Sequence, residues 1–373
     1  MKGHGANVTS SPTRLAALDE LRGLAILAVV ASHIGLVFGP DLEVARFLTI
    51  PALGVGVDLF FVISGFLVAE SVSRARIDCA GAFWRGALAF WAGRLLRIGL
   101  PAWATLALIV GLRALGVLPR VWDADLVASA GFYANVHWAS CFEGQPGCGD
   151  LRAASQFWSL ASEMQFYLVA PLLLALRLKV TAAAGLLILI AGSFCDRPWG
   201  GFWWTFRADG LAVGVLLSLA GARRWPLPQM GSGLTGFWLL VASILVRTAG
   251  VLAPGASVSG VALIFGFVVA SSVGRASGSE PPTPMEKLGI LSFSVYLTHL
   301  PIMTAIHQLF IGRVDPIVLL SSSIVAILLG AIGMDRFVTS PSQILGRRIL
   351  RRICRGSDVP APRDATPSEA RRQ

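Results

Sequence analysis

Charged residues are scarce in this chain of 373 residues, at 14% of the total, whereas 55% of the residues are hydrophobic. The mean hydropathy is +0.69. A water-soluble domain of this size does not need so many apolar residues. The composition therefore indicates a polytopic membrane protein and excludes a water-soluble globular protein. No stretch that is poor in apolar residues is long enough for a separate soluble domain, and we find no clear internal repeat.

Small residues of a cleavage site are also missing after the first apolar run, which disfavours a cleavable leader. We therefore expect that run to be retained as a helix. Windows of about 20 residues predict an all-α protein with about ten transmembrane helices. They cover residues 18–39, 48–72, 98–118, 157–176, 180–195, 202–220, 234–252, 258–274, 288–310 and 316–337.

Basic residues are distributed unevenly between the connecting segments. Most of the 31 lysines and arginines fall on one side if the N-terminus is cytoplasmic, so the positive-inside rule predicts that both termini are cytoplasmic. We expect a short tail over 1–14, a transmembrane domain over 15–337, and a basic, mostly disordered tail over 338–373. The net charge of +10 then reflects topology and contact with anionic lipids, with no nucleic acid as a partner.

Cysteine is rare, with five residues in the chain. Cys141 and Cys148 fall in one outer loop, where an oxidising compartment would permit a disulfide, and the sequence leaves that pairing open. Cys79 and Cys354 fall on the inner side. We expect no metal site, because no two further ligands cluster near the outer pair.

The first apolar segment contains two ionisable residues, Arg22 near its start and His33 deep inside. Eleven residues of α-helix turn about 1100° and rise roughly 16 Å, so the two share a face, one at the membrane boundary and one near the middle. Such groups often mark a pathway or a site. The alternative is a snorkelling arginine and a satisfied core histidine, but the shared face favours a functional role. Asp19, three residues earlier, is placed to pair with Arg22.

Arg94 and Arg97 lie three residues apart at the predicted inner edge of the membrane, and thus on one helical face. Two guanidinium groups there suit bidentate contact with phosphate, although ordinary positive-inside anchoring is the alternative. Other polar residues interrupt apolar spans and need a partner or a purpose. These residues are Asp58, Ser64, Ser159, Glu163, Arg207, Tyr296 and His299.

Five strings of the sequence together resemble the acyltransferase 3 family of membrane acyltransferases. They are residues 18–23 with His33, 56–67, 94–97, 158–160 with 163–167, and 292–299. They occur in the order of the family and cover about residues 15–337. Two departures stand out: Gln156 replaces a histidine, and Met164 a glutamate, that many members carry.

The resemblance implies transfer of an acyl group, usually acetyl, from cytoplasmic acyl-CoA to a hydroxyl of a carbohydrate or glycolipid acceptor, such as a cell-surface polysaccharide. It implies a multi-pass protein of a bacterial inner membrane with no permanently bound cofactor. We expect a stand-alone form, without a fused esterase-like domain. The main alternative is a transporter or flippase for a glycan or lipid, because polar groups at the midplane also mark transport sites.

The expected roles follow from depth in the membrane. His33 suits a general base because the ordinary pKa of imidazole is near neutral, and Glu163 is the second catalytic candidate. Arg22, Arg94 and Arg97 are expected to hold the acyl-CoA. The residues expected to orient the substrate or the imidazole are Asp19, Asp58, Ser64, Ser159, Arg207, Tyr296 and His299.

Overall fold

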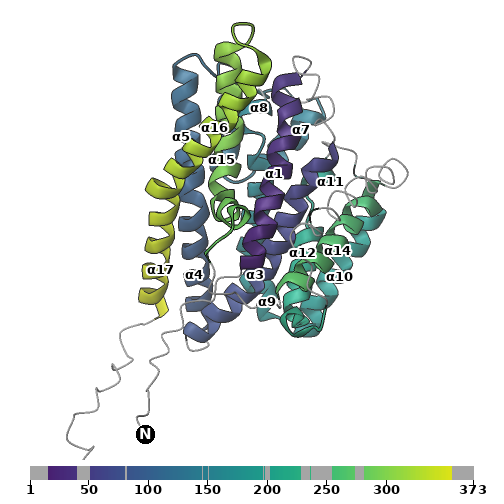
Figure 1. The fold of residues 1–373 in the computed structure, drawn as a ribbon. Coiled ribbons are helices and arrows are strands. Elements are labelled where there is room, and N and C mark those ends of the chain that lie inside the picture. The colour runs from purple at the N-terminus through teal and green to yellow at the C-terminus, as the bar shows by residue number, and fades with distance from the viewer. Residues whose placement is uncertain are drawn as a thin grey trace, which may run out of the picture.

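The computed structural model describes residues 16–39, 51–79, 82–144, 146–149, 151–195, 197, 202–227, 236, 254–273 and 281–354. These residues are almost entirely helical, and no strand occurs among them (Figure 1). The elements are α1 (Ala16–Phe38), η2 (Pro51–Val55), α3 (Gly56–Asp78), α4 (Phe83–Arg94), η3 (Leu95–Gly99), α5 (Leu100–Ala114), α6 (Asp123–Ala130), α7 (Ala134–Phe142), α8 (Leu151–Ala154), α9 (Phe157–Ala175), α10 (Leu178–Phe194), α11 (Phe202–Thr205), α12 (Asp209–Leu219), η4 (Ala222–Arg224), α14 (Pro254–Val273), α15 (Pro284–Phe310), α16 (Pro316–Met334), η5 (Asp335–Thr339) and α17 (Ser340–Cys354).

Seven helical stretches in the described part of the chain are long and apolar enough to cross a membrane. They are Ala16–Phe38, Leu53–Ala75, Phe83–Ala114, Phe157–Ala175, Gly255–Val273, Pro284–Phe310 and Pro316–Cys354. The prediction of an all-α polytopic membrane protein is therefore confirmed. The cytoplasmic location of the termini stays a prediction.

The remaining three predicted spans differ from this set. The span predicted at 180–195 is the shorter apolar helix α10, and the one at 202–220 is broken into α11 and α12. Helix α12 has 11 residues, which rise only roughly 16 Å, about half the hydrocarbon thickness. Arg207 lies in the break and forms an ion pair with Asp58, a distant partner that an apolar window cannot detect. The predicted span 234–252 lies outside the described residues.

Glycines let the central helices approach closely. Helices α1 and α15 lie side by side along the bundle (Figure 1). At Gly289 of α15, any Cβ atom would clash with the backbone carbonyl of Asp19. Gly65 of α3 meets Leu211 of α12 in the same way. Small residues at such crossings replace the hydrophobic driving force that is missing within a membrane. The Gly289 crossing therefore fixes the end of α1 that carries Arg22.

Two π-helical segments, η3 and η5, interrupt the long helices Phe83–Ala114 and Pro316–Cys354. Each segment ends two residues before a proline, at Pro101 and Pro341 respectively. A proline lacks an N–H group, and its ring clashes with the carbonyl four residues earlier, so a widened turn relieves the clash without breaking the helix. Such π-helical turns are rare in proteins, and a large share of those that exist lie at functional sites.

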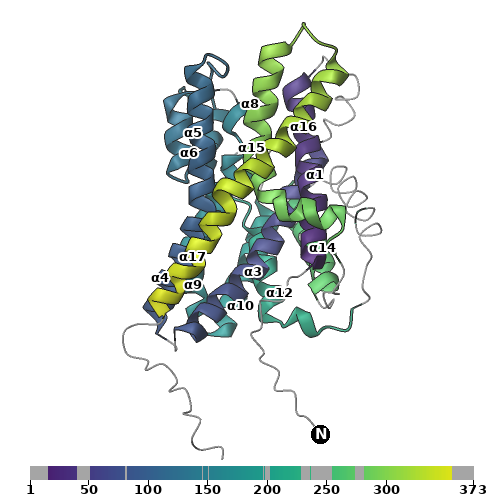
Figure 2. The same ribbon diagram turned by 60° about the vertical axis from the view of Figure 1, so that its left-hand side comes forward.

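Helix α17 occupies the first part of the segment that the sequence assigned to a basic tail. It continues from α16 through η5 and packs against α4 and η3 (Figure 2). Basic residues along α17 lower its mean hydropathy, which explains why an apolar window ends before it. The residues after Cys354 lie outside the described part of the chain.

Two disulfides lie at opposite ends of the bundle. Cys141 and Cys148 are joined across the loop that follows α7, the pairing that the sequence left open. Cys79, which follows α3, is joined to Cys354 at the end of α17. The latter two cysteines are 275 residues apart, so no local pattern pairs them. In Figure 1, α7 and the C-terminal end of α17 lie at opposite ends of the molecule.

Candidate active site

A cavity of about 520 Å³ lies between α1, α3, α4, α9, α15 and the two π segments, a volume typical of small-molecule sites. Its polar lining consists of Asp19, Arg22, Ser64, Arg94, Arg97, Ser159, Glu163, Tyr167, Ser292, Tyr296, Asp335, Thr339, Ser340, Gln343 and Arg347. Most residues singled out from the sequence are in this set. His33, Asp58, Arg207 and His299 are not.

Arg94 is held in place on one wall of the cavity. Its Nη2 donates to the hydroxyl of Ser71 at 2.9 Å. Its guanidinium carbon lies 5.3 Å from the ring centre of Phe90 and 4.9 Å from that of Tyr167. Stacking on two rings orients the guanidinium plane. This arrangement is more than a membrane anchor needs, because a side chain that only marks the inner edge gains nothing from a fixed plane.

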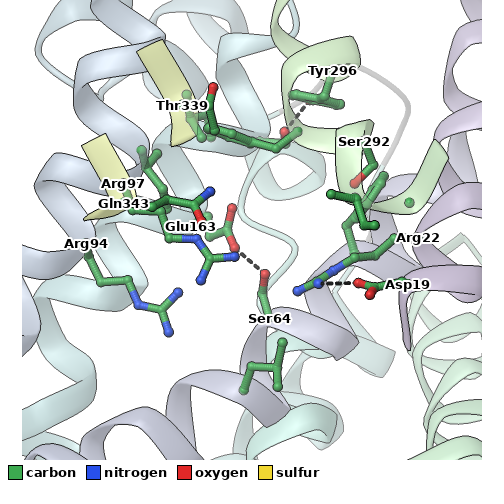
Figure 3. A pocket seen from close by; sticks show the side chains of 18 of the residues that line it. Asp19, Arg22, Ser64, Arg94, Arg97, Glu163, Ser292, Tyr296, Thr339 and Gln343 are labelled. Atoms are coloured by element: carbon green, nitrogen blue, oxygen red, sulfur yellow. Dashed lines mark hydrogen bonds and ion pairs between the residues drawn. The ribbon is translucent and has the colours of Figure 1, made fainter. Parts of the chain in front are cut away.

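Arg97 and Arg22 complete the basic part of the lining. Arg22 forms an ion pair with Asp19 at 3.3 Å, as the sequence predicted. Arg97, by contrast, neither donates a hydrogen bond to nor pairs with any residue in the described ranges. Figure 3 shows Arg94 and Arg97 on one side of the cavity and Arg22 on the other. The cavity thus presents guanidinium donors that can bind an anion.

Glu163 lies between these arginines, near the middle of the cavity (Figure 3). Its carboxylate accepts hydrogen bonds from the hydroxyl groups of Ser64 and Tyr167. Tyr167 follows Glu163 by four residues, a spacing that places both on one face of α9. The two hydroxyl donors fix the orientation of the carboxylate.

Tyr296 forms the inner end of the cavity. Its hydroxyl donates to the backbone carbonyl of Gln156 at 2.8 Å and is hydrogen-bonded to the hydroxyl of Ser159. Both partners belong to the start of α9, so this network ties α15 to α9. Tyr296 is also the last lining residue before two histidines, since its ring centre lies 5.7 Å from that of His299.

The two histidines form a pair just beyond Tyr296. Nε2 of His299 lies 3.4 Å from Nδ1 of His33. Nδ1 of His299 lies 2.7 Å from the carbonyl oxygen of Tyr296, and Nδ1 of His33 lies 2.8 Å from that of Val29. A carbonyl only accepts, so each neutral ring carries its proton on Nδ1. The Nε2 atom of His33 therefore keeps its lone pair, as a base requires.

Comparisons with known proteins place the chain in a family. The acyltransferase domain family, Acyl_transf_3, matches residues 15–336. The chain belongs to this acyltransferase family. The match covers every residue singled out from the sequence, including the cavity residues on α1, α3, α9 and α15.

Several curated proteins are similar to this chain over most of its length. The O-acetyltransferase OatA of Staphylococcus aureus (strain NCTC 8325 / PS 47) is 25% identical over 373 residues, which cover 89% of this chain and 57% of the relative. The putative membrane-bound transacylase BcsY of Komagataeibacter xylinus is 29% identical, covering 79% of this chain and 74% of the relative. The chain thus spans a little over half the length of OatA. No solved structure matches the chain.

Asp58 and Arg207 lie outside the cavity of the acyltransferase domain. Nη1 of Arg207 donates to Oδ2 of Asp58 at 3.1 Å, and the guanidinium carbon lies 5.2 Å from the ring centre of Trp158. Both side chains are buried. The pair joins the break before α12 to α3 and supports the bundle, so the structure gives Asp58 a partner but does not bring it to the cavity.

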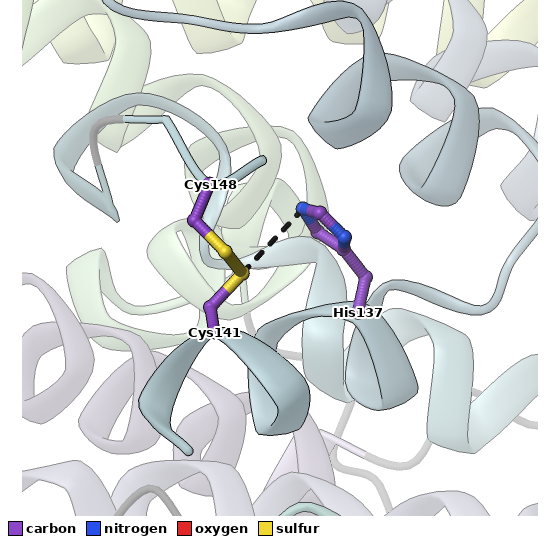
Figure 4. Close-up of side chains that lie close together, drawn as sticks. All are labelled: His137, Cys141 and Cys148. Carbon is purple, nitrogen blue, oxygen red and sulfur yellow. Dashed lines mark hydrogen bonds between the residues drawn. A yellow bond between two sulfur atoms is a disulfide. The ribbon is translucent and has the colours of Figure 1, made fainter. Parts of the chain in front are cut away.

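Among the described residues, His137, Cys141 and Cys148 have ligand atoms within 4.8 Å of one another (Figure 4). The two sulfurs are joined in the disulfide, so neither is a thiolate that can bind a metal while the bond is intact. His137 instead contacts Oδ1 of Asp125 at 2.8 Å. This cluster is better explained by a structural role, in which the disulfide holds the loop after α7 in place.

Sequence reasoning missed the cavity residues that come from η5 and α17. They are Asp335, Thr339, Ser340, Gln343 and Arg347. The last four lie beyond the matched acyltransferase domain, which ends at residue 336. A repeat of polar residues at spacings of three and four along 340–347 is the signal that would have indicated a common face.

Proposed function

We propose that the protein is an integral membrane O-acyltransferase of a bacterial inner membrane. It moves an acyl group, with acetyl as the first candidate, from cytoplasmic acyl-CoA to a hydroxyl of a carbohydrate acceptor such as a cell-surface polysaccharide. The observation that carries this proposal is the cavity of the acyltransferase domain, in which Arg94 and Arg97 face a fixed carboxylate, Glu163.

The lining of the cavity supports one orientation of the donor. Phosphate groups of CoA pair with Arg94 and Arg97, because planar guanidinium groups bind phosphate oxygens bidentately. The pantetheine arm then runs past Phe60 and Phe61, apolar residues of the lining, toward Tyr296. The thioester is thereby delivered to the end of the cavity nearest to the histidine pair.

The reaction needs a proton acceptor on the side of the attacking hydroxyl. The hydroxyl oxygen attacks the thioester carbonyl carbon, the carbon–sulfur bond breaks, and the CoA thiolate takes up the proton that the hydroxyl loses. We assign the transient acceptance of that proton to Nε2 of His33, on the far side of Tyr296 from the donor. Glu163 is the positioning residue within the cavity, where its two hydroxyl partners hold its carboxylate between the arginines that bind the donor.

The test measures donor binding, turnover and product in parallel. The full chain is reconstituted in lipid nanodiscs, where acetyl-CoA binding is titrated and the release of free CoA is followed with and without glycan acceptor. In cells, ester-linked acetyl groups on surface glycans are compared with and without the gene. We expect binding, acceptor-dependent CoA release and loss of one glycan ester in the deletion.

Two results would overturn the proposal. One is the absence of acetyl-CoA binding to the folded chain, with surface esters unchanged in the deletion strain. The other is unchanged acylation together with glycan or lipid retained on the wrong side of the membrane, which would identify a transporter. A double variant, Arg94→Ala with Arg97→Ala, serves as the matched negative control for donor binding.

A further inference from the structure

Helix α17 provides one wall of the cavity although it lies beyond the matched acyltransferase domain. Ser340, Gln343 and Arg347 all line the cavity. Their spacings of three and four residues place them on a single face of the helix. Figure 3 shows Gln343 next to Arg97. The face of α17 that meets the cavity is therefore polar and ends in a guanidinium group.

Helix α17 packs against α4 and η3, the two elements that carry Arg94 and Arg97. A Cβ atom built on Gly346 would lie 3.6 Å from the carbonyl oxygen of Gly93 and 3.8 Å from Cβ of Leu96. Gly346 precedes Arg347, and Gly93 precedes Arg94, so this contact brings the two arginines to the same part of the cavity. The π segments η3 and η5 also meet α5 and α17 here.

The charges in the cavity leave Arg347 available for a ligand. Each carboxylate of the lining is already engaged, as Asp335, for example, accepts from the hydroxyl of Ser340 at 3.0 Å. Glu163 accepts from two hydroxyl groups, and Asp19 pairs with Arg22. Arg347 is exposed, and within the described ranges it forms neither a hydrogen bond nor an ion pair.

Two other arginines of the described chain form ion pairs with carboxylates, as surface arginines commonly do. Arg223 binds Glu70 through Nε at 2.5 Å and Nη2 at 2.8 Å, and Arg113 pairs with Asp123 at 2.5 Å. The hydrogen bonds to Glu70 raise the pKa of Arg223. Arg347 differs because it faces a cavity that already holds Arg94 and Arg97. The lining holds four arginines against three carboxylates, those of Asp19, Glu163 and Asp335, so its formal charge is positive and favours an anion.

We infer that Arg347 binds a phosphate at the nucleotide end of the acyl-CoA donor. The inference rests on the proposed function and adds a binding residue to the same site. Arg347 is solvent-exposed at the edge of the cavity, whereas Glu163 and Tyr296 mark its interior. The pantetheine arm occupies the interior, so the nucleotide end of the donor remains at the edge, beside α17.

The experiment compares two donors on the full chain in nanodiscs. Acetyl-CoA carries the nucleotide, and S-acetyl-4′-phosphopantetheine lacks it. We expect Arg347→Ala to raise the dissociation constant of acetyl-CoA by about tenfold, the effect of losing one charge-assisted hydrogen-bond pair. The same variant should bind S-acetyl-4′-phosphopantetheine as the parent does. Arg347→Lys keeps the charge and the helix but loses the fork, so it should recover part of the affinity.

Arg348→Ala is the matched control, because it removes the same charge from the next position of α17, and Arg348 does not line the cavity. We expect its affinity to stay within about twofold of the parent, as for surface charges. Equal losses in the two alanine variants would show a general surface effect and overturn the inference. So would an Arg347→Ala variant with parental affinity for acetyl-CoA. A parent chain that binds neither donor would instead defeat the proposed function itself.

Discussion

Nε2 of His299 lies 3.4 Å from Nδ1 of His33, and the two rings meet edge-on at an interplanar angle of 64° across the contact between α15 and α1. Both Nδ1 atoms also lie within 2.8 Å of backbone carbonyls. The pair is therefore arranged so that His299 supports the ring of His33 while Nε2 of His33 keeps its lone pair. Tyr296 lies between this pair and the cavity, so under the proposed function the two substrates would meet at the level of that tyrosine.

Replacement of His33 by alanine should lower turnover by about 10²- to 10⁴-fold, the range for losing a general base, with acetyl-CoA binding retained. His299→Ala should cause a smaller loss, because His299 acts by orienting His33. The measurement is the rate of acceptor-dependent CoA release from nanodiscs. An inserted His33→Ala protein that acylates at the parental rate would exclude His33 as the base.

Glu163→Gln should separate the two catalytic candidates. The amide keeps the shape of the carboxylate but removes a negative charge from between arginines, so donor affinity should rise by up to about tenfold. Turnover should fall by less than the roughly 10²-fold minimum expected for a lost base. Titration of acetyl-CoA and single-turnover rates give the two quantities. A fall as large as that of His33→Ala, with unchanged affinity, would make Glu163 the proton acceptor.

The parts of the site that sequence reasoning found are those set by spacing within one helix. Arg94 with Arg97, and Asp19 with Arg22, follow from helical periodicity, and the structure places all four on the cavity. The contacts that sequence reasoning missed join residues that are far apart in the chain. The pairing of Asp58 with Arg207 crosses 149 residues.

Helix α17 was missed for a second reason. Its basic residues lower its hydropathy below that of an apolar window, and only its packing against α4 and η3 brings Ser340, Gln343 and Arg347 to the cavity. For His33, helical periodicity gave the face of the helix but not the distance from the cavity. Helical periodicity placed it on the face of Arg22, but Tyr296 of another helix lines the cavity end next to the histidine pair, and His33 itself is not in the lining.

Arg94→Ala or Arg97→Ala should weaken acetyl-CoA binding by about 1–3 kcal/mol each, the range for hydrogen bonds to charged groups. Arg97 should show the larger effect, because it makes no hydrogen bond within the described ranges and all its donors can bind the ligand, whereas Arg94 already donates to Ser71. Lysine at either position should restore only part of the affinity, since it lacks the planar fork. If the double alanine variant bound acetyl-CoA with parental affinity, the two arginines would serve only to set the topology in the membrane.

The two disulfides give a test of the orientation in the membrane. They lie at opposite ends of the bundle, yet only one side of a bacterial inner membrane is oxidising. With both termini cytoplasmic, we expect the Cys141–Cys148 disulfide to persist in cells, whereas the reducing cytoplasm should convert the Cys79–Cys354 disulfide to two thiols.

When cells are lysed directly into denaturant that contains a maleimide, which exposes the buried Cys79, the reagent should therefore modify Cys79 and Cys354 directly, but Cys141 and Cys148 only after reduction. Mass spectrometry of the labelled peptides reads out each site, and Cys79→Ser with Cys354→Ser provides a background for the outer pair. The reverse pattern would place the N-terminus outside and, with it, the cavity of Arg94 and Arg97 on the wrong side for cytoplasmic acyl-CoA. Because the donor is made in the cytoplasm, the labelling pattern and the donor site must agree for the proposed function to stand.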